Sequence, residues 1–450
     1  IDFDIEILVR MYWEGTEIDF VDTRVIYPQG GISHFDALWD NVKISWMHTR
    51  LFFGMLQRIP RLLARHRHDA TDGSPHWSRR RERGTIAGIK VMLAVYALLG
   101  RRTAVKLHPV LLAMLLMTFV CGVSVANAGN FDVGRFSLIG LGMVTVLTGL
   151  VYVILAEREL TWIYRVMAIV LGASMALSVV GGTHNESGRS TGTFGDPNEW
   201  ATLVLLVTPV LLGGLATDRA TGARLLRLGL LGLAPLSIFA SGSRAALLVG
   251  AVVGLSCLVV LRNQRAELVG AGMLGLLVAP FVVDVEAAYM RFSRLLGRAS
   301  GQMVTDSSLD ERGELLRQGA DLFMDNWFLG VGAGNYEYAT GFISLEGKLR
   351  PAHNTYLEVA SEQGIVGILA GLVFYGVLAA TLWAAFRQAP DEGHRARVLG
   401  AATGLAASAV MAATLGLLTF SMGYLMLGLT LAVVHQSDAA RPMAGRAHAA

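Results

Sequence analysis

The chain has 450 residues, of which 53% are hydrophobic and only 16% are charged, with a mean hydropathy of +0.49. Soluble domains carry about 25% charged residues, so this composition excludes a purely soluble enzyme and indicates a polytopic membrane protein. The two cysteines, Cys121 and Cys257, lie in apolar runs. This excludes a disulfide framework and a cysteine-based metal site, and we expect both to be small apolar core residues.

The net charge of +3 is unevenly distributed. Residues 1–49 hold 3 basic and 9 acidic groups, whereas residues 50–106 hold 13 basic and 3 acidic groups. A basic stretch next to a first membrane span indicates attraction to anionic headgroups, so we expect membrane lipids and no nucleic acid as partners. Because the chain opens in mid-pattern at Ile1, without a signal peptide, we expect its start to be missing.

Apolar runs of the roughly 20 residues that a bilayer core requires predict an all-α polytopic membrane protein. About ten spans are predicted, at residues 107–128, 135–156, 162–182, 199–217, 225–240, 245–261, 266–283, 364–386, 398–415 and 416–434. Lys and Arg gather in alternate loops, which predicts that both chain ends are cytoplasmic. We therefore divide the chain into a small mixed cytoplasmic segment (1–106), a membrane domain (107–435) and a disordered cytoplasmic tail (436–450).

One connection, residues 284–352, breaks the rhythm of short loops and, by the same alternation, faces outward. Long loops are uncommon and are usually functional. Apolar residues at helical spacing predict a helix over about residues 310–325 within it. The GVGAGN stretch at 330–335 resembles a nucleotide-binding glycine loop, but no βαβ unit surrounds it, so we do not expect a nucleotide there.

The first polar motif on the outward side is GTFGDPNEWA, residues 192–201. Pro197 should end extended structure, and Asp196 or Asn198 can cap the helix that follows. A plain helix-capping turn is the alternative to a role in binding.

The second motif is SGSRAALL, residues 241–248, in which Arg244 lies between two apolar runs. A charge near membrane depth is costly and indicates a functional site. Its guanidinium suits bidentate contacts with phosphate oxygens, and Ser243 belongs to a turn open enough for an anion. An arginine that reaches back to the surface as an anchor is the alternative.

Two further candidates belong to the long connection and its end. Arg312 lies in the first turn of the predicted loop helix, where a cation opposes the helix dipole; a surface salt bridge is the alternative. His353 precedes Thr355 and Glu358, whose T-x-x-E spacing predicts a capping box that opens a helix. A histidine there can act as a base near neutral pH, and a loop histidine in water is the alternative.

In this order, GTFGDPNEWA, SGSRAALL, DERGELLRQGADLFMDNWFLGVGAGNYEYA and HNTYLEVASEQGIVG resemble the O-antigen ligase and polymerase superfamily of the bacterial inner membrane. The resemblance covers about residues 190–435 well and extends to the spans from residue 107 onward. It departs from the family at Trp327, where Pro is frequent, and at the front, where one or two more spans are expected before residue 107. It implies a metal-independent glycosyltransferase of the periplasmic face in surface polysaccharide assembly. Such an enzyme moves a glycan from a polyprenyl-diphosphate (undecaprenyl-diphosphate) donor to a saccharide or lipid A-core acceptor of lipopolysaccharide.

Carried over residue by residue, Arg244 and Arg312 resemble the family's arginines that hold the donor diphosphate, and His353 resembles its essential loop histidine. We add as candidate substrate-binding residues Asp196, Asn198, Ser243, Asn354 and Arg317. No cluster of Asp and Glu has metal-ligand character, so we expect neither a metal nor a cofactor. Ligase, polymerase and protein O-glycosylation activities remain open.

Residues 1–106 resemble other enzymes. FDIEILVRMYWEGTEI with YPQGGISHFDALWDNVKIS looks like the C-terminal tail of a family-2 glycosyltransferase, and HWSRRRERGT with YALLGRR looks like the start of a lipid acyltransferase domain. Neither domain is complete, so we expect neither activity. A natural fusion that has lost parts, or a truncated or misassembled chain, would both explain this. The alternatives to a glycan transferase are a flippase for lipid-linked glycans and a membrane-anchored transferase acting through this segment.

Overall fold

The computed structural model describes residues 107–180, 183–184, 189–260, 265–282, 293, 307–341 and 349–447, all within the second of two compact units, Leu93–Ala450. The two resemblances predicted for residues 1–106 lie outside the described residues, as do parts of the long connection.

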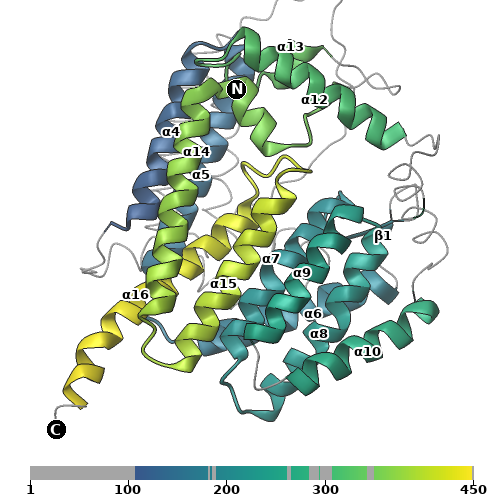
Figure 1. Cartoon of the computed structure of the whole chain (residues 1–450), viewed down its shortest axis with the longest axis vertical. Helices are drawn as coiled ribbons and strands as arrows, with labels where there is room; N and C mark the ends of the chain where they lie inside the picture. The colour runs from purple at the N-terminus through teal and green to yellow at the C-terminus, as the bar shows by residue number, and fades with distance from the viewer. Residues whose placement is uncertain are drawn as a thin grey trace, which may run out of the picture. The chain divides into compact units, whose positions relative to one another are not determined.

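The described part of the chain is almost entirely helical (Figure 1), which confirms the all-α prediction. A helix lies at each predicted span: α4 (Pro109–Ala126), α5 (Phe131–Leu155), α6 (Thr161–Val180), α7 (Pro197–Leu215), α8 (Thr221–Ser241), α9 (Arg244–Val260), α10 (Arg265–Val282), α14 (Thr355–Arg387), α15 (Glu392–Met411) and α16 (Ser421–Ala447). Two short antiparallel strands, β1 (Thr183–His184) and β2 (Ser190–Gly192), precede α7.

Six of the described helices are long and apolar enough to cross a membrane, judged by length and composition: α4, α5, α6, α7, α8 and α14. Helix α9 is apolar but shorter, over Arg244–Val259. The fold is therefore that of an all-α membrane protein, while the count of ten spans and the orientation of the chain ends stay predictions.

Helix α7 lies at the centre of the bundle, and most of its side chains are buried. It packs against α15 with little room for side chains. A Cβ added at Gly213 of α7 would overlap the Ala396 carbonyl, and one added at Gly400 of α15 would overlap the Pro209 carbonyl. Small residues let membrane helices approach backbone to backbone in this way, so the helix that begins at the GDPN turn has a fixed position.

Helix α14 contains a break at Gly364, where φ is +63° and ψ is −158°. In an unbroken helix the Ile365 N–H would donate to the Ser361 carbonyl. Instead it donates to the Trp327 carbonyl at 2.8 Å, and the Ser361 carbonyl accepts the Val331 N–H at 3.0 Å. The long connection thus replaces the helix's own hydrogen bonds at the break.

The glycines of the GVGAGN stretch make this exchange possible. Gly330 has φ +70°, and a Cβ there would overlap the Glu362 backbone. Two residues on, the Gly332 N–H donates to the Glu362 carbonyl at 2.9 Å, and Asn335 accepts the Asn130 N–H at 2.8 Å. The stretch is therefore a packing loop between α14 and the α4–α5 connection, which explains a glycine pattern that is not a nucleotide site.

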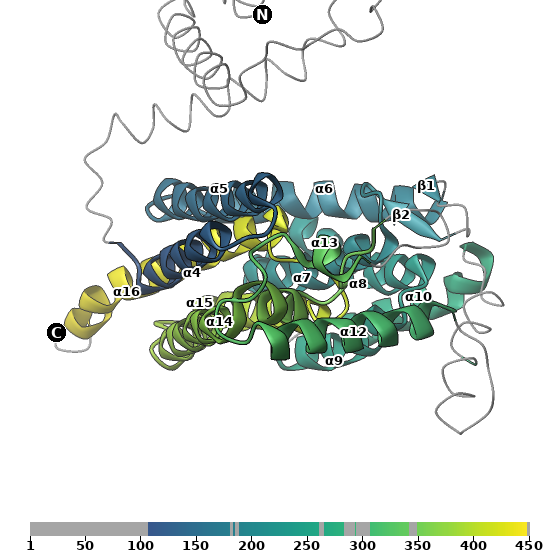
Figure 2. The same ribbon diagram turned by 90° about the horizontal axis from the view of Figure 1, so that it is seen from above.

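Helices α12 (Ser307–Asp325) and α13 (Tyr336–Thr340) lie in the long connection, and α12 confirms the helix predicted over residues 310–325. Both lie at one end of the bundle, and α12 runs across it in the view from above (Figures 1 and 2). Buried Leu315 packs with Tyr336, whose hydroxyl donates to the Leu315 carbonyl at 2.6 Å. This contact ties α12 to the packing loop.

Helix α16 continues to Ala447, beyond residue 436, where we predicted a disordered tail. The division of the chain into three parts stays a prediction, and polar side chains fix the beginning of this stretch. The Gln436 amide donates to the carbonyls of Leu155 and Arg158 at 3.1 and 2.7 Å, at and just after the end of α5. The Ser437 hydroxyl donates to the Val433 carbonyl at 3.0 Å.

Replacing Gly330 by Ala should destabilise the protein. The new Cβ would overlap the Glu362 backbone, and the left-handed φ is unfavourable for Ala. Together these effects should cost about 2–4 kcal/mol, seen as a fall in Tm on the order of 5 °C in detergent. Gly313→Ala is the matched control, because Gly313 lies on α12 with nothing within 4 Å of an added Cβ. Equal Tm values for the two variants would contradict the packing role of Gly330.

Candidate functional site

His353 lies two residues before the start of α14, and its backbone is in the left-handed region with φ +49°. Among the described residues, it is the only one other than glycine with positive φ. This conformation costs a bulky L-residue on the order of 1–3 kcal/mol and persists only where neighbours fix it. Such outliers cluster at functional sites. The backbone conformation is therefore an independent reason to consider His353 a functional residue.

Thr355, the first residue of α14, fixes this turn to the α15–α16 connection. Its N–H donates to the carbonyls of Ala412 and Leu415 at 2.8 and 3.0 Å. Its hydroxyl donates to the Leu415 carbonyl at 2.7 Å and accepts the Leu417 N–H at 2.7 Å. These four bonds hold the backbone immediately after His353.

Asn354 caps α14, with its side-chain oxygen accepting the N–H groups of Tyr356 and Leu357 at 3.0 and 3.1 Å. The predicted Thr355–Glu358 capping box is therefore wrong. The Thr355 hydroxyl is taken by the neighbouring connection, and Asn is the stronger N-cap residue. The cap commits the oxygen of Asn354, so only its amide NH₂ group remains for the substrate contact that we predicted.

The His353 imidazole is partly buried among charges of both signs. Burial lowers its pKa, and so do the Arg312 and Arg350 guanidinium groups, whereas the Asp196 and Glu311 carboxylates raise it, and the net shift is downward. Arg350 also forms an ion pair with Glu311 at 2.9 Å, beside Arg312. The structure thus brings Arg312 and Asp196, predicted separately from the sequence, to His353, and adds Arg350 and Glu311, which we did not predict.

Asp196 ends the GTFGD turn and caps α7, as the sequence allowed. Its Oδ1 accepts the N–H groups of Asn198 and Glu199 at 2.7 and 3.0 Å. Asp196 is thus a helix cap, but it also has a second effect, because the same carboxylate raises the pKa of His353. Asp196 therefore connects the start of α7 to the histidine.

The SGSR motif forms the turn between α8 and α9. Gly242 is left-handed, with φ +60°, and the Ser243 N–H donates to the Ser241 hydroxyl at 3.2 Å. The Ser243 hydroxyl in turn accepts the Ala246 N–H at 3.4 Å in the first turn of α9. Arg244 is the first residue of α9 and is half-buried. The structure thus places Arg244 at the N-terminus of α9, a helix that packs against α7.

Arg189 links the first two motifs, and we did not predict it. Its Nε donates to the Ser241 carbonyl at 2.7 Å, and its Nη2 donates to the Asn198 side-chain oxygen at 3.0 Å. One guanidinium therefore fixes the SGSR turn against the GDPN turn. The available signal was a single arginine in a short segment that is predicted to face outward and is otherwise rich in Gly, Ser and Thr.

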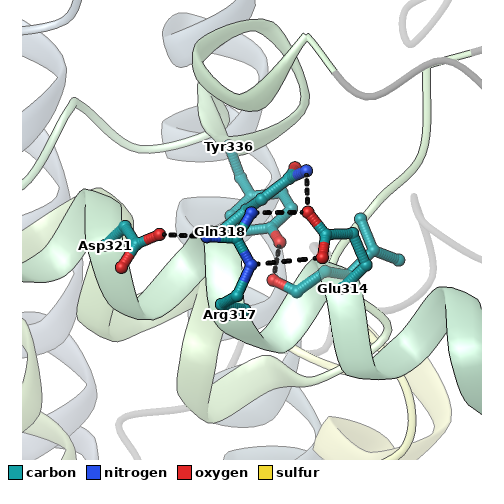
Figure 3. A network of polar contacts seen from close by, with 6 residues as sticks. Glu314, Arg317, Gln318, Asp321 and Tyr336 are labelled. Carbon is teal, nitrogen blue, oxygen red and sulfur yellow. Dashed lines mark hydrogen bonds and ion pairs between the residues drawn. The ribbon is translucent and has the colours of Figure 1, made fainter.

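Arg317 lies apart from this cluster. Its guanidinium forms ion pairs with Glu314 and Asp321 at 2.7 and 3.0 Å along the exposed face of α12 (Figure 3). Hydrogen bonds from Arg317 and Gln318 lower the pKa of Glu314 to about 2. The residue thus has the contacts of a surface salt bridge, and its predicted contact with substrate remains a prediction.

Within the described ranges, no group of three or more His, Cys, Asp or Glu side chains could hold a metal ion. The positive charges gathered around His353 are instead those of Arg312 and Arg350. Arrangements of this kind bind anions through charge-assisted hydrogen bonds. The arrangement is suited chemically to an anionic ligand next to a weak base.

Arg189→Lys should lower Tm, because lysine lacks the fork that reaches both Ser241 and Asn198. A hydrogen bond to a charged group contributes about 1.5–3 kcal/mol. Asn198→Ala should lower Tm less in the Arg189→Lys background than in the wild type, because the two residues share one contact. Strictly additive effects in this double-mutant cycle would show that the contact does not stabilise the protein.

Histidine-selective NMR should find the pKa of His353 below the ordinary value of about 6.5, because burial and Arg312 lower it. Asp196→Asn should lower it further by removing a charge that favours the imidazolium ion. Arg312→Gln should raise it, for the opposite reason. If neither substitution changes the pKa of His353, the proposed proximity of Asp196 and Arg312 to the imidazole is contradicted.

Residues 229–372 match the family model described as O-antigen ligase. The match begins within α8 and ends within α14, and so includes Arg244, Arg312 and His353. Asp196, Asn198 and Arg189 precede it. No curated protein matches the chain. The predicted resemblance to the O-antigen ligase and polymerase superfamily is thus confirmed over the part of the chain that carries the two arginines and the histidine.

Proposed function

We propose that this protein is a glycosyltransferase that moves a glycan from a polyprenyl-diphosphate carrier to a saccharide or lipid acceptor on the periplasmic face of the inner membrane. The O-antigen ligase match supports a role in surface polysaccharide assembly, as ligase or polymerase. The observation that carries the proposal is the strained His353 turn, which holds a weak base next to Arg312 and Asp196.

The donor would be held through its diphosphate. Arg312 supplies a cation beside His353, and Arg244 supplies a second at the N-terminus of α9. Helix N-termini and guanidinium groups both stabilise anionic oxygens. As the bond between the anomeric carbon and the diphosphate oxygen breaks, negative charge grows on the leaving group, and preorganised positive charge lowers the barrier.

His353 would act on the acceptor. The acceptor hydroxyl oxygen forms a bond to the anomeric carbon while its proton passes to the neutral imidazole, and the polyprenyl diphosphate leaves with the electron pair of the broken bond. Direct displacement predicts inversion at that carbon. The lowered pKa of His353 keeps the imidazole neutral at pH 7, so activity should be lost only as the pH falls through that pKa.

Asp196, Asn198, Ser243 and Asn354 would orient the substrates around this base. Each is already held by a backbone hydrogen bond or by Arg189. Groups fixed in this way need little further ordering when a substrate binds. Arg317, on the exposed face of α12, would contact the more distant sugars of a long glycan.

His353→Asn should reduce transfer by about 10²–10⁴-fold, the contribution of a general base, in proteoliposomes supplied with the lipid-linked donor. Asn tolerates the left-handed backbone, so the variant should fold. His394→Asn is the matched control, because His394 lies at the start of α15 and pairs with Asp391. Wild-type activity should survive EDTA. Full activity in His353→Asn would refute the assigned base, and loss in EDTA would refute metal independence.

The products of the reaction distinguish the remaining activities. In a host that lacks the protein, free lipid-linked polymer without attachment identifies a ligase, and single repeat units identify a polymerase. A flippase moves the lipid-linked glycan without forming a glycosidic bond. That outcome in the reconstituted system would overturn the proposal.

A further inference from the structure

Trp327 and Phe328 lie side by side on the surface, in the turn that follows α12. Their ring centroids are 5.5 Å apart, and the residues are 58% and 55% exposed. Met324, one helical turn earlier, is 72% exposed. Three large apolar side chains in one short segment are a surface that water solvates poorly, so this patch, defined as Met324, Trp327 and Phe328, requires an explanation.

The backbone fixes the position of the patch relative to α14. The Ile365 N–H donates to the Trp327 carbonyl at 2.8 Å, directly after the break at Gly364. From Ile365 onward α14 is a continuous helix to Arg387. Trp327 therefore lies level with the beginning of the uninterrupted apolar part of α14.

The other end of α14 carries a second exposed aromatic group. Trp383 is 62% exposed, and the Arg387 guanidinium lies 5.7 Å from the centroid of its ring. Phe386 packs against Trp383 with centroids 6.2 Å apart, and Arg395 lies 5.5 Å from its ring. Aromatic rings next to arginines are typical of the bilayer interface, where the ring meets the acyl chains and the cation meets the headgroups.

The distance between the two aromatic groups matches a bilayer. From Ile365 to Trp383 the helix advances 18 residues, which at 1.5 Å per residue is about 27 Å, against a hydrocarbon core of about 30 Å. Between them, α14 exposes an apolar stripe that includes Leu369 and Leu372, 54% and 62% exposed. This is the pattern of a helix face in contact with lipid.

We propose that the Met324–Trp327–Phe328 patch inserts into the headgroup region of the membrane and fastens the long connection to the bilayer surface. Trp383 then marks the opposite interface. Indole rings favour this layer because one side is apolar while the N–H finds polar partners. Because α12 ends two residues before Trp327, insertion holds the helix that carries Arg312 at headgroup level. The inference rests on the membrane location of α14 and not on glycan transfer.

Spin labels on the full chain in lipid vesicles test the proposal. A nitroxide at Met324→Cys should be more accessible to oxygen, which concentrates in the bilayer, than to a water-soluble nickel complex. Leu372→Cys should show the same preference more strongly. Arg317→Cys, on the face of α12 that is 63% exposed at Arg317, should show the reverse. The two native cysteines are buried, and the unsubstituted protein measures their residual labelling.

Replacing both aromatic residues, as Trp327→Ser with Phe328→Ser, should increase nickel accessibility at position 324 several-fold and leave position 372 unchanged. The unchanged value at 372 shows that the variant still folds into the bilayer. The proposal is overturned if position 324 is as accessible to nickel as position 317, as expected for a sugar-stacking surface in water. It is also overturned if position 324 excludes both reagents, as expected beneath a second protein copy.

Discussion

The exchange of hydrogen bonds at the break in α14 is the constraint on which the rest of the structure depends. Ile365 gives up its helical partner for the Trp327 carbonyl, and the Ser361 carbonyl accepts Val331 instead. The Ile365 N–H and the Ser361 carbonyl thus both keep a hydrogen-bond partner. A buried backbone group without one would cost several kcal/mol inside a membrane protein. The segment of α14 before the break can therefore take its own direction, and it begins at the His353 turn.

A continuous series of contacts then joins the candidate residues. Arg189 fixes the SGSR turn to Asn198, and Asp196 caps the same helix and acts on His353. Arg312 approaches His353 from α12, whose position depends on Tyr336 and the packing loop. Two segments distant in sequence, the GDPN turn and α12, thus bring charges to one imidazole, and each is held by bonds that do not involve a substrate. Such preorganisation is what charge stabilisation in a transition state requires.

Features with a local signature could be predicted from the sequence. The apolar runs located the helices, the helical spacing located α12, and His353, Arg312 and Asp196 stood out as polar residues in an apolar chain. Features that depend on distant partners could not. In the sequence, Arg189 looks like any loop arginine, because its contact with Ser241 depends on the fold. Gly364 likewise looks like an ordinary helix glycine, because the acceptor for the next N–H, the Trp327 carbonyl, comes from a distant segment. The cap of α14 was misassigned for the same reason, because the Thr355 hydroxyl is used by a connection 60 residues away.

The same exchange has a consequence for biosynthesis. The acceptor that Ile365 requires and the donors that Ser361 and Glu362 require all lie earlier in the chain, between Trp327 and Gly332. The ribosome synthesises residues 327–332 before residues 361–365, so the hydrogen-bond partners of the break already exist when α14 emerges. Without those partners, a continuous helix is the form in which residues 355–387 satisfy their own backbone hydrogen bonds. The break at Gly364 therefore forms only when residues 327–332 have packed against α14.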